Sequence, residues 1–328
     1  MFNARVLATV LAMTSFIYAE EVVIYSGRSR SLVAPLVKRI EAKTGVKVTM
    51  RYGKTAHLAM LLMEEGEHSP ADIFWAQDAG ALSALAQKGK LAPLPKSLLE
   101  KVPVAFRDSG GRWVATSGRA RVLAYSKRRV DTADLPKSVF ELTDPKWKGL
   151  VGWAPTNGSF QAFVTAMRAR EGEEKTRKWL KAMIANGTKA YAKNTPILQA
   201  LAAGEIDIGL PNHYYLLRFL ASDPEFPVAQ TVFQAGDIGN LVNVAGAAVR
   251  KGSKKSAAAQ KVIEFLLSPE AQGYFTEKVF EYPVANGAVA NKKLLPMDEM
   301  QKNAASIDLN VLKDLAGTLE LMRDVGLL

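Results

Sequence analysis

Four residues with polar side chains stand together at the start of an apolar run: Asn212, His213, Tyr214 and Tyr215. Neighbouring residues on a β-strand point to opposite faces, so a strand would not bring both phenols to one place. At a junction between a strand and a helix the backbone turns, and two neighbouring side chains can converge. A tyrosine pair at the edge of a core, with its hydroxyls in water, is the alternative interpretation. What the chain places opposite the two phenols decides between them.

Other polar residues stand where predicted strands end, at positions 25–29, 75–78, 154–160 and 191–194. Arginine side chains there can hold a carbonate or carboxylate through two parallel hydrogen bonds, and backbone N–H groups at a helix start attract an oxyanion. Helix capping, turns and surface charges are the alternative interpretations. The joint placement at successive strand ends favours an anion site made by Arg28, Arg119, Asn157, Gly158, Ser159, Asn194 and Asn212.

The elements that must position these residues alternate between strands and helices. Residues 21–27, 46–53 and 71–77 have the composition of buried strands, and helical apolar patterns follow each of them. A second series of strands and helices begins near residue 120, and residues 242–275 resemble a return to the first. This order predicts two α/β lobes, each with a mainly parallel sheet flanked by helices. Ligands of such sheets bind beyond the carboxyl ends of the strands.

The chain is predicted to divide into a leader and two lobes. Residues 1–19 carry one arginine, an apolar run and Ala19 before Glu20, which is typical of a signal peptide cleaved near Ala19. The apolar run is too short to span a bilayer, and no later segment is predicted to insert in a membrane. The predicted N-terminal lobe contains residues 20–119 and 245–295, and the C-terminal lobe residues 120–244 and 296–328.

Composition narrows the possible chemistry. The 328 residues include no cysteine, which excludes disulfides, thiol catalysis, thiolate zinc sites and a lipid-modified cysteine after the leader. The net charge of +11 favours anionic partners. Because lysine and arginine are scattered among acidic residues, with no dense basic tract, nucleic-acid binding is not expected.

Motifs for catalysis are missing from the sequence. The three histidines, His57, His68 and His213, form no H-E-x-x-H arrangement, and the chain has no G-x-S-x-G, P-loop or G-x-G-x-x-G sequence. A secreted hydrolase or transferase would need an acid–base or nucleophilic group of residues that the sequence does not present. We therefore expect a binding protein rather than an enzyme.

Taken in order, several segments resemble the periplasmic ferric-iron-binding proteins of ABC transporters, which are bilobal solute-binding proteins. They are "VVIYSGR", "SPADIFWAQD", "VATSGRARVLAYSK", "PKWKGLVGWAPTNGSFQAF", "YAKNT", "GEIDIGLPNHYYL", "LVNVAGAAV" and "FLLSPEAQGYF". The resemblance covers nearly the whole chain after the leader. It implies the two-lobed periplasmic-binding-protein fold, a ligand cleft between the lobes, a periplasmic location and a membrane permease as partner. We expect a monomer.

The resemblance implies that Tyr214 and Tyr215 are iron ligands. Fe³⁺ is a hard cation that prefers anionic oxygen donors, and the bound ion displaces the phenol protons. The remaining ligands differ from the family's pattern. Where one branch of the family has a ligand histidine and a ligand glutamate, this chain has Ser29 and Gln77, and where another has a third tyrosine it has Phe160.

Two phenolates leave most of an octahedral shell to other groups. By the resemblance a synergistic anion, carbonate (or bicarbonate) or phosphate, completes it, held by the predicted anion site. Ser29, Gln77, Asp78 and Tyr25 are possible further groups at or next to the metal, although the strand position of Tyr25 favours a core role. In an alternative, the same fold binds an organic or phosphorylated anion in place of iron.

Overall fold

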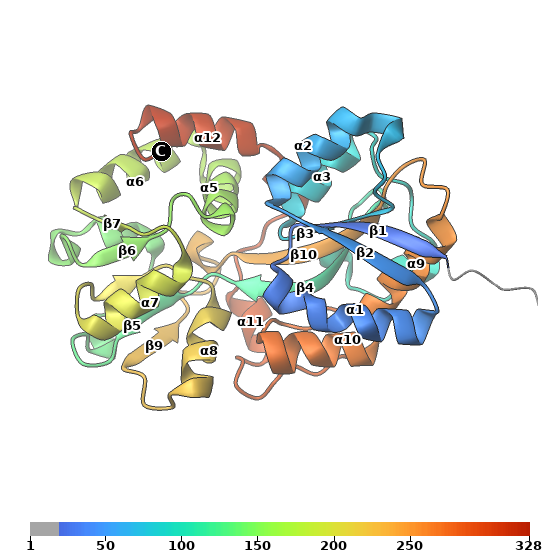
Figure 1. The fold of residues 1–328 in the computed structure, drawn as a ribbon. Coiled ribbons are helices and arrows are strands. Elements are labelled where there is room, and N and C mark those ends of the chain that lie inside the picture. Colours follow the sequence, from blue (N-terminus) through green and yellow to red (C-terminus); the bar gives the residue numbers. More distant parts are fainter. Residues whose placement is uncertain (1–19) are drawn as a thin grey trace, which may run out of the picture.

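Two five-stranded sheets lie next to each other, and each forms the centre of one lobe (Figure 1). The computed structural model describes residues 20–328, so the predicted signal peptide lies outside the described residues. The first sheet has the order β2 (Lys47–Tyr52), β1 (Glu21–Ser26), β3 (Ile73–Ala76), β10 (Val242–Val249) and β4 (Val114–Ala120). The second has the order β7 (Lys189–Ala190), β6 (Val151–Trp153), β8 (Ile208–Gly209), β5 (Leu123–Ser126) and β9 (Val228–Thr231).

The two sheets share one pairing scheme. In the first, β1 pairs in parallel with β2 and β3, whereas β10 is antiparallel to both β3 and β4. In the second, β6 pairs in parallel with β7 and β8, whereas β5 is antiparallel to both β8 and β9. The predicted two-lobed α/β fold is confirmed, and each sheet is mixed because one strand, β10 in the first and β5 in the second, runs antiparallel to both of its neighbours.

Helices cover both faces of each sheet (Figure 1). Those of the first lobe are α1 (Arg30–Thr44), α2 (Thr55–Glu65), α3 (Ala79–Gln87), the short α4 (Lys96–Leu99), α9 (Ser256–Leu266) and α10 (Pro269–Tyr274). Those packed on the second sheet are α5 (Gly158–Glu171), α6 (Glu173–Ala185), α7 (Asn194–Ala203) and α8 (His213–Ser222). The last helices are α11 (Met297–Asn303) and α12 (Leu315–Asp324). None of the helices between residues 20 and 328 is long and apolar enough to cross a bilayer.

Gly27 and Thr55 bring the ends of two neighbouring strands, β1 and β3, together. Gly27 follows the strand, and a Cβ there would lie 2.1 Å from Oγ1 of Thr55, so only glycine lets α2 approach the strand end this closely. Thr55 Oγ1 in turn accepts the backbone N–H of Gln77 at 3.2 Å. The ends of β1 and β3 are thereby brought together, as expected for neighbouring parallel strands.

The chain crosses between the lobes at several places. β4 leads through Arg121 and Val122 directly into β5, and the Arg121 N–H donates to the Leu241 carbonyl at 2.9 Å on the returning chain. A third crossing runs along Gly118, which pairs with Tyr282 as an isolated antiparallel bridge. These adjacent crossings form the connection around which the lobes can move relative to each other.

The C-terminal segment contacts both lobes. A 3₁₀ turn at Leu309–Lys313 packs on α3, where a Cβ on Gly80 would meet the Leu312 carbonyl oxygen at 2.5 Å. α12 then packs on α5 of the second lobe, with the hydroxyls of Thr165 and Thr318 2.8 Å apart. Residues beyond 300 therefore link the two lobes by packing on α3 of the first and on α5 of the second (Figure 1).

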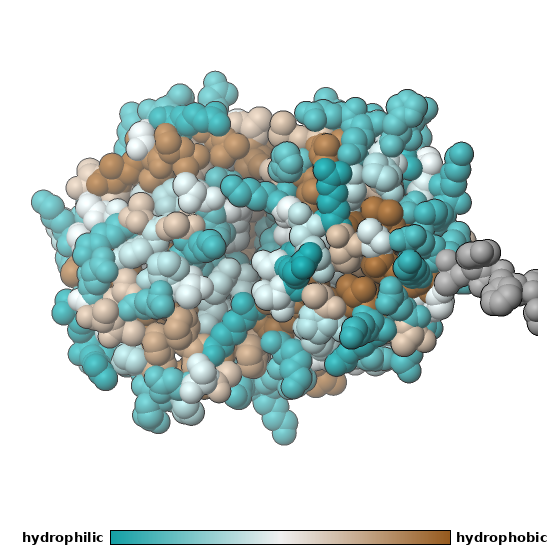
Figure 2. Space-filling view, viewed as in Figure 1, coloured by the Kyte–Doolittle hydropathy of each residue, from teal (hydrophilic) through white to brown (hydrophobic). Residues whose placement is uncertain are grey.

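The segment predicted as a single helix forms two helices in the structure. The apolar pattern over 256–275 predicts a continuous helix, but the structure ends α9 at Leu266 and starts α10 at Pro269. Proline lacks an N–H and favours the first position of a helix, and the Ser268 hydroxyl accepts the Ala271 N–H at 3.3 Å as its cap. In the space-filling view the side chains that project at the periphery are mostly hydrophilic, in agreement with the charged composition (Figure 2).

Candidate functional site

The two adjacent tyrosines lie in the first turn of α8, directly after β8. Asn212 is the residue before the helix, with extended backbone angles, and His213 begins it. Tyr214 is buried and Tyr215 half-buried, and their rings stack with centroids 4.4 Å apart and planes at 28°. The strand-to-helix junction brings both phenols together, as the sequence predicts.

His213 fixes this first turn to the crossings between the lobes. Its Nδ1 accepts the Ala120 N–H at 3.1 Å, and its Nε2 lies 2.8 Å from the Phe280 carbonyl oxygen. A neutral ring with its proton on Nε2 satisfies both contacts, and burial lowers the pKa of His213 to about 4. The ring also packs against Tyr282, with centroids 4.8 Å apart. His213 therefore positions the tyrosines, and its two ring nitrogens are already engaged.

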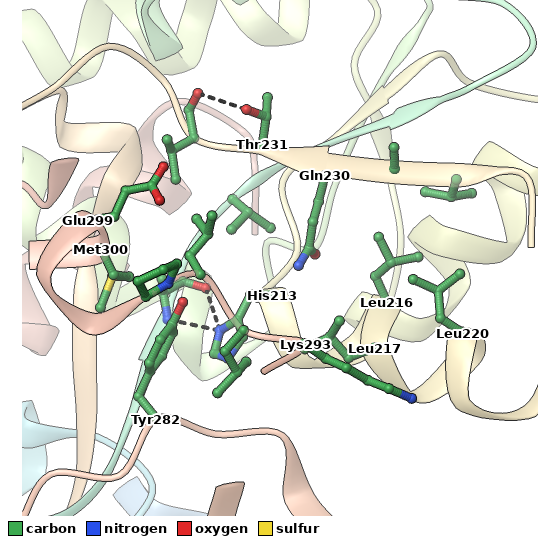
Figure 3. Close-up of a pocket in the computed structure, with 18 of the residues that line it drawn as sticks. His213, Leu216, Leu217, Leu220, Gln230, Thr231, Tyr282, Lys293, Glu299 and Met300 are labelled. Atoms are coloured by element: carbon green, nitrogen blue, oxygen red, sulfur yellow. Dashed lines mark hydrogen bonds between the residues drawn. The ribbon is translucent and has the colours of Figure 1, made fainter. Parts of the chain in front are cut away.

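Behind the tyrosine helix lies a cavity of about 470 Å³. Figure 3 shows His213 and Tyr282 at its wall, with Leu216, Leu217 and Leu220 of α8 along another side. Its lining does not include the two tyrosines. This cavity is therefore not the place toward which the stacked phenols contribute a surface.

Arg121 is buried beside the tyrosines and is tied to the C-terminal lobe. It donates to the carbonyl oxygens of Leu210 and Ser159, the latter at 2.7 Å. Its guanidinium carbon lies 4.9 Å from the ring centroid of Phe163 and 5.5 Å from that of Phe160. Phe160, where a third tyrosine ligand would stand in one branch of the family, is thus packed under an arginine.

Three cations surround the phenols. The Arg218 guanidinium carbon lies 4.9 Å from the ring centroid of Tyr214 and 5.8 Å from that of Tyr215. Burial raises the pKa of Tyr214, the adjacent Tyr215 raises it further, and the charge of Arg119 acts to lower it. Burial lowers the pKa of Arg121 to about 9, and the charge of Arg119 contributes to that decrease. Without a bound cation Tyr214 keeps its proton, and a bound trication would displace it.

Arg119 has the most exceptional surroundings. It is 1% exposed, and none of its three guanidinium nitrogens has a hydrogen-bond partner among residues 20–328. Its nearest acidic atom in an ion pair is Oε1 of Glu281, 3.9 Å from Nη1. Arg119 and Arg121 are both buried, so the surface-charge interpretation of these arginines is wrong. A buried guanidinium without acceptors indicates a place for an anionic ligand.

Two buried asparagines also have side-chain atoms without hydrogen-bond partners among residues 20–328. Both amide atoms of Asn194 and the Nδ2 atom of Asn212 have no partner within the described part of the chain. Neither side chain caps its helix, although Asn212 stands at the capping position of α8. The helix-capping interpretation of these two asparagines is therefore wrong, and their amide groups remain available to a ligand.

In the turn at 157–159, by contrast, the asparagine side chain has hydrogen-bond partners. Oδ1 of Asn157 accepts the N–H of Ser159 at 2.9 Å and its hydroxyl at 2.7 Å, so this side chain caps α5. Gly158 is exposed, and a Cβ there would meet no atom within 4 Å. The helix-cap interpretation accounts for Asn157, and what the turn still offers a ligand is its open backbone at Gly158.

On the N-terminal lobe, Arg28 is paired within the protein. Its Nη1 and Nη2 donate to the two carboxylate oxygens of Glu281 at 3.0 and 2.7 Å, and Nη1 also donates to Oε1 of Gln77 at 3.0 Å. Burial alone would raise the pKa of Glu281, but Arg28 and Arg119 hold it below its usual range. Sequence analysis did not identify Glu281, because no pattern links it to an arginine 253 positions earlier.

The other predicted site residues of this lobe are exposed to solvent or hydrogen-bonded within the lobe. Ser29 is exposed at the start of α1. Asp78 caps α3, with burial raising its pKa and Arg119 acting to lower it. The Tyr25 hydroxyl lies 2.9 Å from both carboxylate oxygens of Glu65 and accepts from Arg51 at 2.8 Å. Tyr25 is therefore not brought to the tyrosine pair.

Fold and site together define a class. Two α/β lobes joined by adjacent crossings, with unpartnered cationic and amide groups beside a stacked phenol pair, are the features of a bilobal solute-binding protein. The model of the family described as bacterial extracellular solute-binding protein matches residues 68–313. The chain belongs to this family.

The relatives narrow the resemblance. An Fe(3+)-binding periplasmic protein of Serratia marcescens is 34% identical over 310 residues, 94% of this chain and 90% of the relative. The crystal structure of iron-bound HitA from Pseudomonas aeruginosa matches with a TM-score of 0.88 at 34% identity, covering 94% and 99% of the two chains. A Trichodesmium FutA in complex with iron and citrate matches with a TM-score of 0.81 at 31% identity, covering 94% and 100%. The resemblance to the periplasmic ferric-iron-binding proteins is confirmed.

Proposed function

We propose that this protein captures ferric iron in the periplasm, together with a synergistic anion, and delivers it to the membrane permease of an ABC transporter. The observation that carries the proposal is the stacked pair of Tyr214 and Tyr215 beside Arg119, whose three guanidinium nitrogens have no hydrogen-bond partner among residues 20–328. Relatives named for ferric-iron binding support it. Binding and release, without turnover, is the activity we propose.

In this proposal the two phenolates are the protein's ligands to iron. Hard Fe³⁺ favours anionic oxygen, and two phenolates stabilise it over Fe²⁺ because the more highly charged ion gains more from each negative charge. Ser29 is exposed and Phe160 packs on Trp153, with ring centroids 5.4 Å apart, so neither side chain completes the shell. The remaining positions go to the anion.

The anion lies between the iron and the unpartnered donors of Arg119, Asn194 and Asn212. A guanidinium binds carbonate, phosphate or carboxylate through parallel hydrogen bonds, and each buried donor gains a partner that it lacks in the protein alone. The citrate of the Trichodesmium structure supports a carboxylate as a further possible anion. Closure of the lobes would bury the iron, and the permease would favour reopening.

A second function keeps the fold and changes the ligand. The same three donors could be the principal contacts of an organic or phosphorylated anion without iron, with the tyrosines hydrogen-bonding to it. Arg119 favours this alternative as strongly as it favours a synergistic anion, because its unpartnered nitrogens call for an anion and not for a metal.

Visible spectroscopy separates the two functions. Ferric ion is added to the purified protein with and without bicarbonate. A charge-transfer band that grows in proportion to iron and saturates at one equivalent supports tyrosinate–iron bonds, and its dependence on bicarbonate supports the anion. A folded protein that develops no band would reject the iron function and favour the anion alone.

A further inference from the structure

Two buried arginines and one buried carboxylate form a group at the junction of the lobes. Arg28 is 1% exposed, Arg119 is 1% exposed and Glu281 is fully buried. Arg28 comes from the end of β1, Arg119 from β4, and Glu281 from the crossing segment beside Tyr282. In this group one negative charge faces two positive charges. The Asp78 carboxyl and the Arg121 guanidinium also act on Arg119, and because their charges are opposite, the excess of one positive charge remains when both groups are ionised.

The geometry divides the carboxylate unequally between the arginines. Both oxygens of Glu281 accept from Arg28, at 3.0 and 2.7 Å, and Oε2 also accepts the Ser117 hydroxyl at 2.5 Å. The distance from Oε1 to Nη1 of Arg119 is 3.9 Å, which is too long for a hydrogen bond. Both terminal nitrogens of Arg28 are engaged by Glu281 and only its Nε has no partner, whereas all three guanidinium nitrogens of Arg119 have no hydrogen-bond partner among residues 20–328.

We propose that Glu281 determines how tightly the site binds an anion, by engaging Arg28 and leaving Arg119 as the cation that receives the anion. This inference rests on the proposed function, since it concerns the anion of that site. The buried excess charge is then the reason that an anion binds: it is neutralised when the anion enters and is unfavourable when the site has none. Glu281 itself touches neither iron nor anion, and acts as a positioning residue.

The role makes an unusual prediction about charge. Glu281→Gln leaves two buried guanidiniums without a counter-charge, so the site gains one positive charge and should bind inorganic phosphate on the order of tenfold more tightly. Arg28→Gln leaves Glu281 for Arg119, 3.9 Å away, so phosphate should bind on the order of tenfold more weakly. The double variant Arg28→Gln/Glu281→Gln restores the original net charge and should return to within about twofold of the unsubstituted protein.

The experiment is a calorimetric titration of the three variants and the unsubstituted protein with phosphate, with circular dichroism to check folding. The matched control is the same pair of changes at Arg39 and Glu270, an exposed ion pair 3.8 Å apart, and it should leave the affinity unchanged. A merely structural role for Glu281 predicts weaker binding in every variant and no recovery in the double variant. That result would overturn the inference.

The charge series is also distinguishable from the proposed function. If the unsubstituted protein develops the ferric charge-transfer band but the four affinities are equal, the inference fails and the iron function stands. If the unsubstituted protein binds no phosphate, bicarbonate or citrate, the anion site fails, and the inference fails with it. Should Glu281→Gln not fold, the loss of affinity expected for Arg28→Gln and its recovery in the double variant still decide the question.

Discussion

The polar groups on the two sides of the cleft differ in how their hydrogen bonds are used. On the C-terminal lobe, Asn194 and Asn212 are buried with amide atoms that lack partners, and the phenols of Tyr214 and Tyr215 stack next to them. On the N-terminal lobe, Arg28 is held by Glu281 and Gln77. Groups without internal partners are the ones that gain most from a ligand. From this comparison we propose that the C-terminal lobe, with Arg119 of β4, holds the ligand and that the N-terminal lobe covers it.

The largest effect is expected from the tyrosines. Tyr214→Phe and Tyr215→Phe should each weaken ferric binding by more than roughly a hundredfold, since loss of a group that only supports a ligand already costs 10- to 100-fold. Competition with a chelator measures the affinity. Tyr25→Phe is the matched control from the N-terminal lobe, because its hydroxyl is bonded to Glu65, and it should bind iron normally. Loss of binding in that control and not in the pair would reverse the comparison.

Arg119 should come next. Arg119→Gln keeps a polar side chain and removes the charge, and we expect ferric affinity in bicarbonate to fall by roughly 10- to 100-fold. The diagnostic feature is that the variant should bind iron equally with and without bicarbonate. An unchanged response to bicarbonate would show that the anion is held elsewhere.

Three asparagines sharpen the comparison within one lobe. Asn194→Ala and Asn212→Ala each remove a donor to the ligand and should weaken anion binding by roughly tenfold, the value of one hydrogen bond of about 1.4 kcal/mol. Asn157→Ala removes a helix cap and should lower the free energy of unfolding by about 1 kcal/mol with affinity kept. Chemical denaturation and calorimetry on the same samples measure both quantities, and equal behaviour of the three would contradict the assignment.

The last prediction concerns the pH dependence of stability and not the affinity for a ligand. His213 has its pKa lowered by burial to about 4, below its ordinary value of 6.5, so the unfolded chain binds the proton more readily. Stability from the neutral ring is present above pH 6.5 and is lost as pH falls toward 4, by at most about 3 kcal/mol. Unfolding of iron-free His213→Gln should lack this part of the slope. A slope identical to that of the unsubstituted protein would show that other groups cause it.

Local sequence patterns predicted much of the fold. The strands at 21–27, 46–53 and 71–77 contain β1, β2 and β3, and the junction before Tyr214 is where the structure has it. These features depend on near neighbours, and periodicity and glycine positions record them. The break before Pro269 was not predicted, although proline starts a helix more easily than it continues one.

Pairings between distant residues were not predictable. Arg28 and Arg119 were both predicted from the sequence to bind the anion. In the structure Arg28 donates to both carboxylate oxygens of Glu281, whereas Nη1 of Arg119 lies 3.9 Å from the same carboxylate. The same holds for Asn157, which caps a helix, and Asn212, which stands at the same kind of position and does not. Which polar group keeps its donors depends on contacts across the whole chain, and composition and spacing do not record them.

The most direct test of the account is a crystal structure of the protein grown with ferric ion and bicarbonate, with anomalous scattering used to locate the iron. The account predicts an iron peak bonded to the phenol oxygens of both Tyr214 and Tyr215, with non-protein atoms joining it to Arg119 and with Arg28 still paired to Glu281. An iron held by side chains of the N-terminal lobe, or a cleft filled by an anion without iron, would contradict it.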